Sequence, residues 1–119
     1  MDKDRETGLM LDPKYDANGL ISAVVTDVAD GALLMVGFMD AEALAATRAK
    51  GTVHFHSRSK GRLWQKGESS GHYLHVVEMR IDCDQDAIWI IARPDGPTCH
   101  TGERSCFYRR INDDGLERI

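Results

Sequence analysis

The sequence has few of the residues that tie a chain together covalently or force it into turns. It contains three cysteines and three prolines among 119 residues, against 11 glycines. An odd number of cysteines makes a fully paired disulfide framework impossible within one chain. With so little proline, the sequence is neither collagen-like nor of low complexity. Thiols in a reducing compartment more often bind metal or react than pair. We therefore expect a cytoplasmic protein whose cysteines are free for chemistry.

Long apolar runs and an excess of basic residues are also missing. The longest apolar run covers only residues 87–92, and residues 1–11 contain no apolar stretch of the kind that signal peptides carry. We therefore expect neither a membrane span nor a signal peptide. Fifteen basic residues stand against nineteen acidic ones, which gives a formal charge of −4. This balance argues against a general nucleic-acid-binding protein, because such proteins carry a basic surface.

The size and composition predict a single domain over residues 1–119, with 42% hydrophobic residues to fill one core. Residues 1–18 are polar and are expected to form an extended N-terminal arm. Two apolar segments, 20–28 and 32–38, flank an Asp30-Gly31 turn and predict a β-hairpin. The alanine-rich segment 40–50 predicts a helix with Asp40 as its N-cap and Gly51 as its stop.

The rest of the chain is dominated by alternating or continuous apolar segments that predict strands. These are residues 52–57, 72–81 and 87–92. A glycine-containing loop is expected between the first two, up to Gly71, and short extended pieces over 98–111. The fold class is therefore mainly β or α+β, with an antiparallel sheet and one clear helix at about residues 40–50.

An acidic cluster follows the second of these strands and reads Asp82-Cys83-Asp84-Gln85-Asp86. If the strand continues through it, alternation places the three carboxylates on one side and Cys83 on the other. Carboxylate oxygens suit Mg²⁺, whereas a thiolate suits zinc. The segment therefore indicates two kinds of metal ligand. The alternative interpretation is a solvated acidic turn at the end of a strand.

Two further cysteines, Cys99 and Cys106, lie in a polar, glycine-containing segment. Their separation is wider than the short gap of a zinc knuckle, and buried unreactive thiols are the alternative. With Cys83 they make three thiols, and three protein ligands leave one position on zinc for water, as in catalytic sites. His100 is then a candidate base. The other histidines are expected to be hydrogen-bonded strand residues: His54, His56, His72 and His75.

Residues 52–66 form a local basic segment in this acidic chain, with four cationic side chains and no acidic one. Guanidinium groups, hydroxyls and backbone amides in a flexible turn suit phosphate. Trp64 is either part of the core or a stacking platform for a base. The alternative is an exposed basic loop. The predicted substrate-binding set is Ser57, Arg58, Ser59, Trp64, Lys66, Glu68 and Ser69.

Four motifs follow one another along the chain. The first two read Val53-His54-Phe55-His56-Ser57-Arg58-Ser59 and Leu63-Trp64-Gln65-Lys66-Gly67-Glu68-Ser69-Ser70-Gly71-His72. The third is the acidic cluster, and the fourth runs from Gly96-Pro97-Thr98-Cys99-His100-Thr101-Gly102 through Ser105-Cys106-Phe107. Together they resemble the phosphoribosyl-AMP cyclohydrolase family over about residues 19–107, and the order and spacing of four separate motifs make this resemblance specific.

The resemblance implies two metal sites and a shared assembly. By it, zinc is held by Cys83, Cys99 and Cys106, and Mg²⁺ by Asp82, Asp84 and Asp86. It also implies an intertwined homodimer in which the zinc cysteines come from both subunits. Some relatives continue into a helical pyrophosphohydrolase domain. Because few residues follow Cys106, we expect no such fused domain here.

The resemblance further implies the reaction. The family opens the N1–C6 bond of 1-(5-phosphoribosyl)-AMP by hydrolysis, giving a formimino aminoimidazole carboxamide ribotide in the third step of histidine biosynthesis. We expect zinc-activated water to attack C6, with His100 accepting or relaying a proton. Zinc deaminases attack the same carbon, but the sequence contains neither H-x-E nor C-x-x-C. A zinc-stabilised interaction module is the non-enzymatic alternative, with His100 or His75 as its fourth ligand.

Overall fold

A four-stranded sheet forms the centre of the molecule. The computed structural model describes residues 3–119. The sheet is built from β1 (Ile21–Asp27), β2 (Leu33–Met39), β5 (Leu74–Ile81) and β6 (Ala87–Pro94), in the order β2-β1-β6-β5. The β1–β6 pair is parallel and the other two pairs are antiparallel. The predicted hairpin and the predicted antiparallel-rich β architecture are therefore confirmed.

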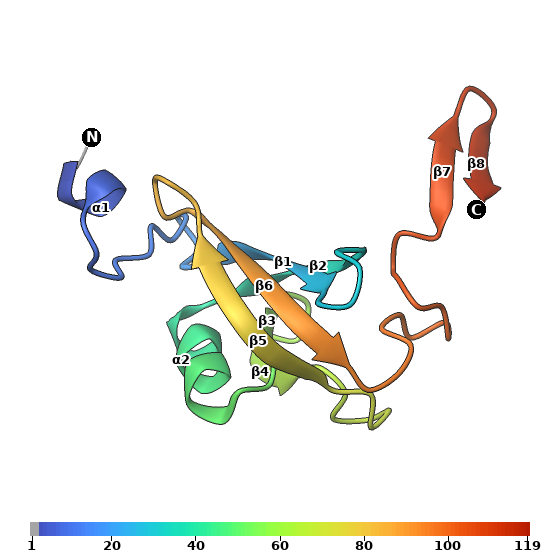
Figure 1. Ribbon diagram of the computed structural model, residues 1–119, viewed down its shortest axis with the longest axis horizontal. Helices are drawn as coiled ribbons and strands as arrows, with labels where there is room; N and C mark the ends of the chain where they lie inside the picture. Colours follow the sequence, from blue (N-terminus) through green and yellow to red (C-terminus); the bar gives the residue numbers. More distant parts are fainter. Residues whose placement is uncertain (1–2) are drawn as a thin grey trace.

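A second layer covers one face of this sheet (Figure 1). It consists of α2 (Ala41–Lys50) and a hairpin of β3 (His54–Ser57) and β4 (Arg62–Gln65). The predicted helix caps are confirmed: Asp40 accepts a hydrogen bond from the Ala43 amide at 2.8 Å, and Gly51 takes a left-handed conformation with φ 73°. The helix therefore begins and ends where the sequence predicted.

The core lies between the two layers. Strand β1 is buried at every second residue, which points Ile21, Ala23 and Val25 at the second layer. Phe55 from β3 fills the centre of the interface, and its ring lies 2.6 Å from where a Cβ would sit on Gly37 of β2. Only glycine allows so close an approach of strand and ring. The buried cluster is completed by Leu34, Met35, Met39, Ala43, Leu44, Val53, Leu74, Ile88, Ile90 and Ala92.

The other face of the sheet is open, and the C-terminal end of the chain extends away from the body. Trp89 is 40% exposed on the open face, where Val36 and Val77 are also exposed. Strands β7 (Arg109–Asn112) and β8 (Gly115–Arg118) form a separate two-stranded sheet, and their hairpin stands clear of the central sheet (Figure 1). The radius of gyration is 15.2 Å, against roughly 13.5 Å for a compact domain of this length.

Four details of the chain differ from the sequence-based expectations. Helix α1 (Lys3–Thr7) interrupts the arm that was expected to be extended. Strand β4 lies inside the predicted loop before Gly71. The C-terminal hairpin was not predicted. Strand β5 ends at Ile81, so residues 82–86 form a turn and not a strand continuation. Among the described residues, no helix is both long and apolar enough to cross a membrane.

Candidate active site

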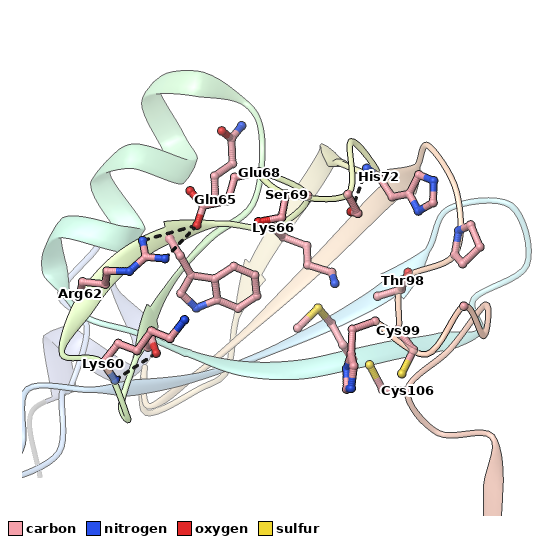
Figure 2. A pocket seen from close by; sticks show the side chains of 18 residues that line it. Lys60, Arg62, Gln65, Lys66, Glu68, Ser69, His72, Thr98, Cys99 and Cys106 are labelled. Carbon is pink, nitrogen blue, oxygen red and sulfur yellow. Dashed lines mark hydrogen bonds and ion pairs between the residues drawn. The ribbon is translucent and has the colours of Figure 1, made fainter.

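A cavity of about 510 Å³ opens between the β3–β4 hairpin and the loop that follows β6. Figure 2 shows that its side chains come from two stretches that are far apart in the sequence. One runs from the basic segment into the glycine-rich turn after β4, and the other is the cysteine loop, residues 97–106; Met35 of β2 also contributes. The lining includes Ser57, Lys60, Arg62, Trp64, Gln65, Lys66, Glu68, Ser69, His72, Thr98, Cys99, His100 and Cys106.

The turn after β4 is shaped by Gly67. Its φ is +95°, a region that side-chain-bearing residues rarely adopt, and an added Cβ would lie 2.6 Å from the His72 carbonyl oxygen. The Gly71 amide donates to the Gly67 carbonyl at 2.7 Å and closes the turn. This tight backbone brings Lys66 and Ser69 to one wall of the cavity and His72 to its rim (Figure 2).

Two thiols lie together on the opposite wall. The Thr101 hydroxyl donates to the Cys99 sulfur at 3.0 Å, and this bond is the main cause that lowers the pKa of Cys99. Partial burial of the Cys106 thiol and the neighbouring Cys99 raise the pKa of Cys106. Lys66 lowers the pKa of both thiols through its charge. Cys99 is therefore the first of the pair to become a thiolate, the form that binds metal.

The cationic side chains give the cavity a positive wall. The Lys66 ammonium lies 6.0 Å from the centre of the Trp64 ring, within cation–π range. Arg62 is held by Glu68 at 3.4 Å, and the Lys60 amide donates to the Ser57 hydroxyl at 3.3 Å. Five members of the predicted substrate-binding set line the cavity: Ser57, Trp64, Lys66, Glu68 and Ser69.

Arg58 and Ser59, the other two members of that set, are not among the cavity-lining residues. The Arg58 guanidinium instead lies 4.1 Å from the centre of the Phe38 ring. The Ser59 hydroxyl lies 3.4 Å from that of Ser57. Both residues lie in the hairpin turn after β3, where strand alternation no longer predicts which side chains face the cavity.

The cavity contains residues that sequence reasoning did not select. His72 lines it, although it was expected to be an ordinary strand histidine. Thr98 also lines it, is only 1% exposed, and its hydroxyl has no hydrogen-bond partner among the described residues. A buried hydroxyl without a partner is costly and marks a place that a ligand can satisfy. The only signal was its position directly before Cys99.

Three histidines lie outside the cavity lining, while His100 belongs to it. His54 is buried, and its Nδ1 lies 2.8 Å from the Thr52 carbonyl. His75 Nε2 lies 2.7 Å from Asp95, which lowers the pKa of that carboxyl. His56 Nδ1 lies 3.2 Å from Asp40. The contacts of His54 and His75 agree with the hydrogen-bonded roles expected for them. His56 differs, because its buried Nδ1 makes no hydrogen bond among the described residues.

The three carboxylates of the acidic cluster do converge, by a different route from the one expected. Their ligand oxygens all lie within 4.8 Å of one another. Gln85 has φ 58°, and this left-handed residue closes the turn that draws Asp84 and Asp86 toward Asp82. The Asp86 and Ala87 amides donate to Asp82 at 2.9 and 3.1 Å. Three oxygens so close together suit a hard divalent cation.

Cys83 lies in this acidic turn, exposed and away from the other two cysteines. All of strand β6 separates it from the cysteine loop (Figure 1), and eight extended residues span roughly 26 Å. Within the described residues of one chain, the three thiols therefore do not form a cluster of ligands. Two thiols and three carboxylates lie at opposite ends of the molecule.

Comparison with known proteins assigns the chain to a family. The profile of phosphoribosyl-AMP cyclohydrolase matches residues 35–108. The chain belongs to the phosphoribosyl-AMP cyclohydrolase family. The proteins of that name from Rhizorhabdus wittichii and Sphingopyxis alaskensis are 66% and 56% identical to it, each over 97% of this chain and over 93% and 91% of their own lengths. The resemblance read from the four motifs is thereby confirmed.

A third relative has the same name and a longer chain. The phosphoribosyl-AMP cyclohydrolase of Sinorhizobium medicae is 58% identical over 98% of this chain and 79% of its own length. The range that matches the cyclohydrolase family profile contains both the cavity and the acidic turn. Both features therefore belong to the part of the fold that defines the family.

Proposed function

We propose that this protein catalyses the phosphoribosyl-AMP cyclohydrolase reaction of histidine biosynthesis, the hydrolytic opening of the N1–C6 bond of 1-(5-phosphoribosyl)-AMP. One observation carries the proposal: a single cavity brings two thiols and His100 opposite a wall of cationic and hydroxyl side chains. The first group can hold a metal and move a proton, and the second can bind a phosphorylated substrate. Family membership supports the choice of this substrate.

The substrate carries two phosphoribosyl groups, so its recognition needs dispersed cationic contacts. Lys60, Arg62 and Lys66 supply them in the cavity, with hydroxyls from Ser57 and Ser69. Trp64 lies beside Phe55 with ring centres 5.4 Å apart, so its ring is fixed by the core while it also lines the cavity. A fixed indole can stack on a purine, which unites the two interpretations of this residue.

The donor sets fit the two metals that the family implies. Thiolates suit zinc, and the hydrogen bond from Thr101 lowers the pKa of Cys99. Cys99 and Cys106 would hold zinc together with Cys83 of the partner subunit, while Asp82, Asp84 and Asp86 would hold Mg²⁺. Zinc bound to three protein ligands lowers the pKa of water toward about 7 and so supplies hydroxide at neutral pH. His100 lines the same cavity and accepts the proton released on attack at C6.

A homodimer would complete the zinc site. One chain leaves an open sheet face with Trp89, Val36 and Val77 exposed. Its C-terminal hairpin exposes Ile111 and Leu116 and pairs with no other strand among the described residues. An isolated two-stranded hairpin is marginally stable in water, so both features favour burial against a second copy. In that assembly the acidic turn of one chain would meet the cysteine loop of the other.

The proposal is tested by following turnover of phosphoribosyl-AMP through its ultraviolet absorbance. We expect activity with Zn²⁺-loaded protein and Mg²⁺, its loss after chelation, and its return when both ions are added back. His100→Ala should lower kcat by about 10²–10⁴-fold, the usual contribution of a general base. The matched control is His75→Gln, since His75 contacts Asp95 outside the cavity lining and should leave kcat unchanged. An inactive Zn²⁺-loaded protein would refute the proposed reaction.

A further inference from the structure

The cysteine loop is held against the turn between β1 and β2 by three consecutive residues. The Arg104 guanidinium donates to Asp27 at 3.0 Å and to Asp30 at 2.8 Å. The Ser105 hydroxyl donates to the Leu33 carbonyl at 2.6 Å. The Cys106 amide donates to the Leu34 carbonyl at 2.8 Å. The loop is therefore anchored by a hydroxyl, a backbone amide and one charged side chain.

The β1–β2 turn presents its two carboxylates in fixed orientations. Asp27 uses one oxygen to accept from the Ala29 amide at 2.9 Å, which leaves the other for Arg104. Asp30 accepts from the Ala32 amide at 3.1 Å with the oxygen that Arg104 also contacts. The Asp27 side chain is only 9% exposed. Because the turn itself orients both carboxylates, it forms a binding site for the Arg104 guanidinium.

Arg104 also reaches the other end of the loop through its backbone. Its carbonyl accepts from the Thr98 amide at 3.1 Å, and the Cys99 amide donates to the Glu103 carbonyl at 3.1 Å. The segment before the first thiol is thus paired with the segment that carries the guanidinium. A shift of Arg104 away from its two carboxylates would therefore move Cys99 as well as Cys106.

We propose that Arg104 is the residue that positions the two cavity thiols, with Asp27 and Asp30 as its fixed receptor. Its ion pairs set the distance between Cys99 and Cys106 before any metal arrives. Metal sites depend on such outer supports, whose loss typically lowers metal affinity by about 10–100-fold. This inference rests on the proposed metal-binding role of Cys99 and Cys106, and it adds the residue that prepares them for that role.

The test titrates Co²⁺ into the metal-free full-length protein and follows the thiolate-to-cobalt charge-transfer absorbance. Arg104→Ala should weaken Co²⁺ binding by at least about tenfold. Arg104→Lys keeps the charge on a different side chain, and should recover part of this loss, because both ion pairs use the single nitrogen Nη2. The matched control is Arg93→Ala, which removes an exposed 3.4 Å ion pair with Asp95 outside the cavity lining and should bind Co²⁺ like the wild type.

Amide hydrogen exchange in the metal-free protein gives a readout that needs no metal. Arg104→Ala should speed exchange of the Cys106 and Cys99 amides by about tenfold or more, while amides of the central sheet stay protected. Unchanged Co²⁺ affinity and unchanged exchange in Arg104→Ala would overturn the proposal. If that variant does not fold, Asp30→Asn, which removes one of the two charged acceptors, should change both readouts in the same direction, and wild-type values would overturn the proposal.

The two proposals fail in distinguishable ways. If the wild-type protein gives no charge-transfer band with Co²⁺, the metal-binding role of the thiols is wrong. The exchange rates of the Cys99 and Cys106 amides still test whether Arg104 holds their loop. If the wild type binds Co²⁺ through its thiols and Arg104→Ala does so equally well, the positioning role alone is wrong.

Discussion

At the scale of single residues, aspartates of the same turn differ in pKa because their surroundings differ. Hydrogen bonds with Asp82 and Asp84 raise the pKa of Asp86 to about 6. Burial opposes ionisation of Asp82, but hydrogen bonds from Asp86 and from the Asp86 and Ala87 amides outweigh it and lower its pKa. Below about pH 6, the three carboxylates therefore share a proton. The acidic turn is therefore prepared to exchange that proton for a cation.

We expect Mg²⁺ binding at the acidic turn to strengthen as the pH rises through about 6. Asp86 binds its proton more tightly in the folded chain than in the unfolded one, so its contribution to stability falls as the pH rises from about 4 to 6. A bound cation reverses this penalty. If only the ionised cluster binds, apparent affinity should increase about tenfold between about pH 5 and 7, measured by titration calorimetry.

Asp84→Asn provides the comparison for this pH dependence. The variant removes one of the groups that raise the pKa of Asp86, so the carboxyl resonance of Asp86 should titrate at lower pH in nuclear magnetic resonance spectra. A wild-type affinity for Mg²⁺ that stays constant between about pH 5 and 7 would contradict the proposed proton exchange.

At the scale of elements, the chain is most predictable where caps and turns act locally. Asp40 and Gly51 delimit α2, and the Asp30-Gly31 turn delimits the first hairpin. Strand β4 is less evident, because Arg62–Gln65 is short and becomes a strand only by pairing with β3. Its residues carry little pattern of their own. Packing of β3 on β2 then decides which side chains can occupy the interface.

Gly37→Ala should destabilise the protein by about 1–3 kcal/mol, the usual cost of adding a methyl group to a packed core. The added Cβ would meet the Phe55 ring, which is 1% exposed and has no free space to move into. Urea denaturation monitored by circular dichroism measures the change in the free energy of unfolding.

A second-site change tests whether the Phe55 ring is the cause. Combined with Gly37→Ala, Phe55→Leu removes the ring atoms that the new methyl group meets. The double variant should therefore be more stable than the sum of the two single losses predicts, because residues in contact are not additive. Strict additivity would show that the cost of Gly37→Ala arises elsewhere.

At the scale of the whole molecule, the single chain leaves several apolar side chains and Cys83 exposed. Its radius of gyration is 15.2 Å, because the N-terminal arm and the C-terminal hairpin extend from the sheet (Figure 1). Its open face exposes Trp89, and its hairpin leaves Ile111 85% exposed. Cys83 lies at the opposite end from the cavity. In the proposed dimer, a second copy would cover such exposed surfaces and bring a cysteine loop to Cys83.

Mixing of inactive subunits should restore activity if each zinc site is shared. Co-expressed Cys83→Ala and Cys99→Ala chains would form one intact site in every mixed dimer, since each chain supplies what the other lacks. Random pairing should give about a quarter of wild-type activity, because half of the dimers are mixed and each has one working site. Turnover of phosphoribosyl-AMP by the purified mixture measures the recovery.

A second mixture provides the control. Cys99→Ala and Cys106→Ala both alter the cysteine loop, and each proposed site takes both of these thiols from one chain. No pairing of these two variants forms an intact site, so the mixture should stay inactive. Equal recovery in the two mixtures would contradict the sharing of Cys83 between subunits.

The sequence by itself determined the local elements, the family and the residue types of the site. Caps and turn residues act over a few positions, so helix α2 and the first hairpin could be read directly. Of the residues selected from the sequence, Cys99, Cys106 and His100 line the cavity, as do five of the seven substrate-binding candidates. These signals are short-range or compositional, so they can be interpreted without knowledge of the fold.

Only the tertiary structure decided which of these residues meet. A left-handed Gln85, and not strand alternation, gathers the three carboxylates. The length of β6 separates Cys83 from Cys99, and the β3–β4 turn sends Arg58 to Phe38 while it leaves Lys60 at the cavity. Arg104 finds its two carboxylates more than seventy positions away in the chain. Such contacts depend on long-range packing, which no local pattern encodes.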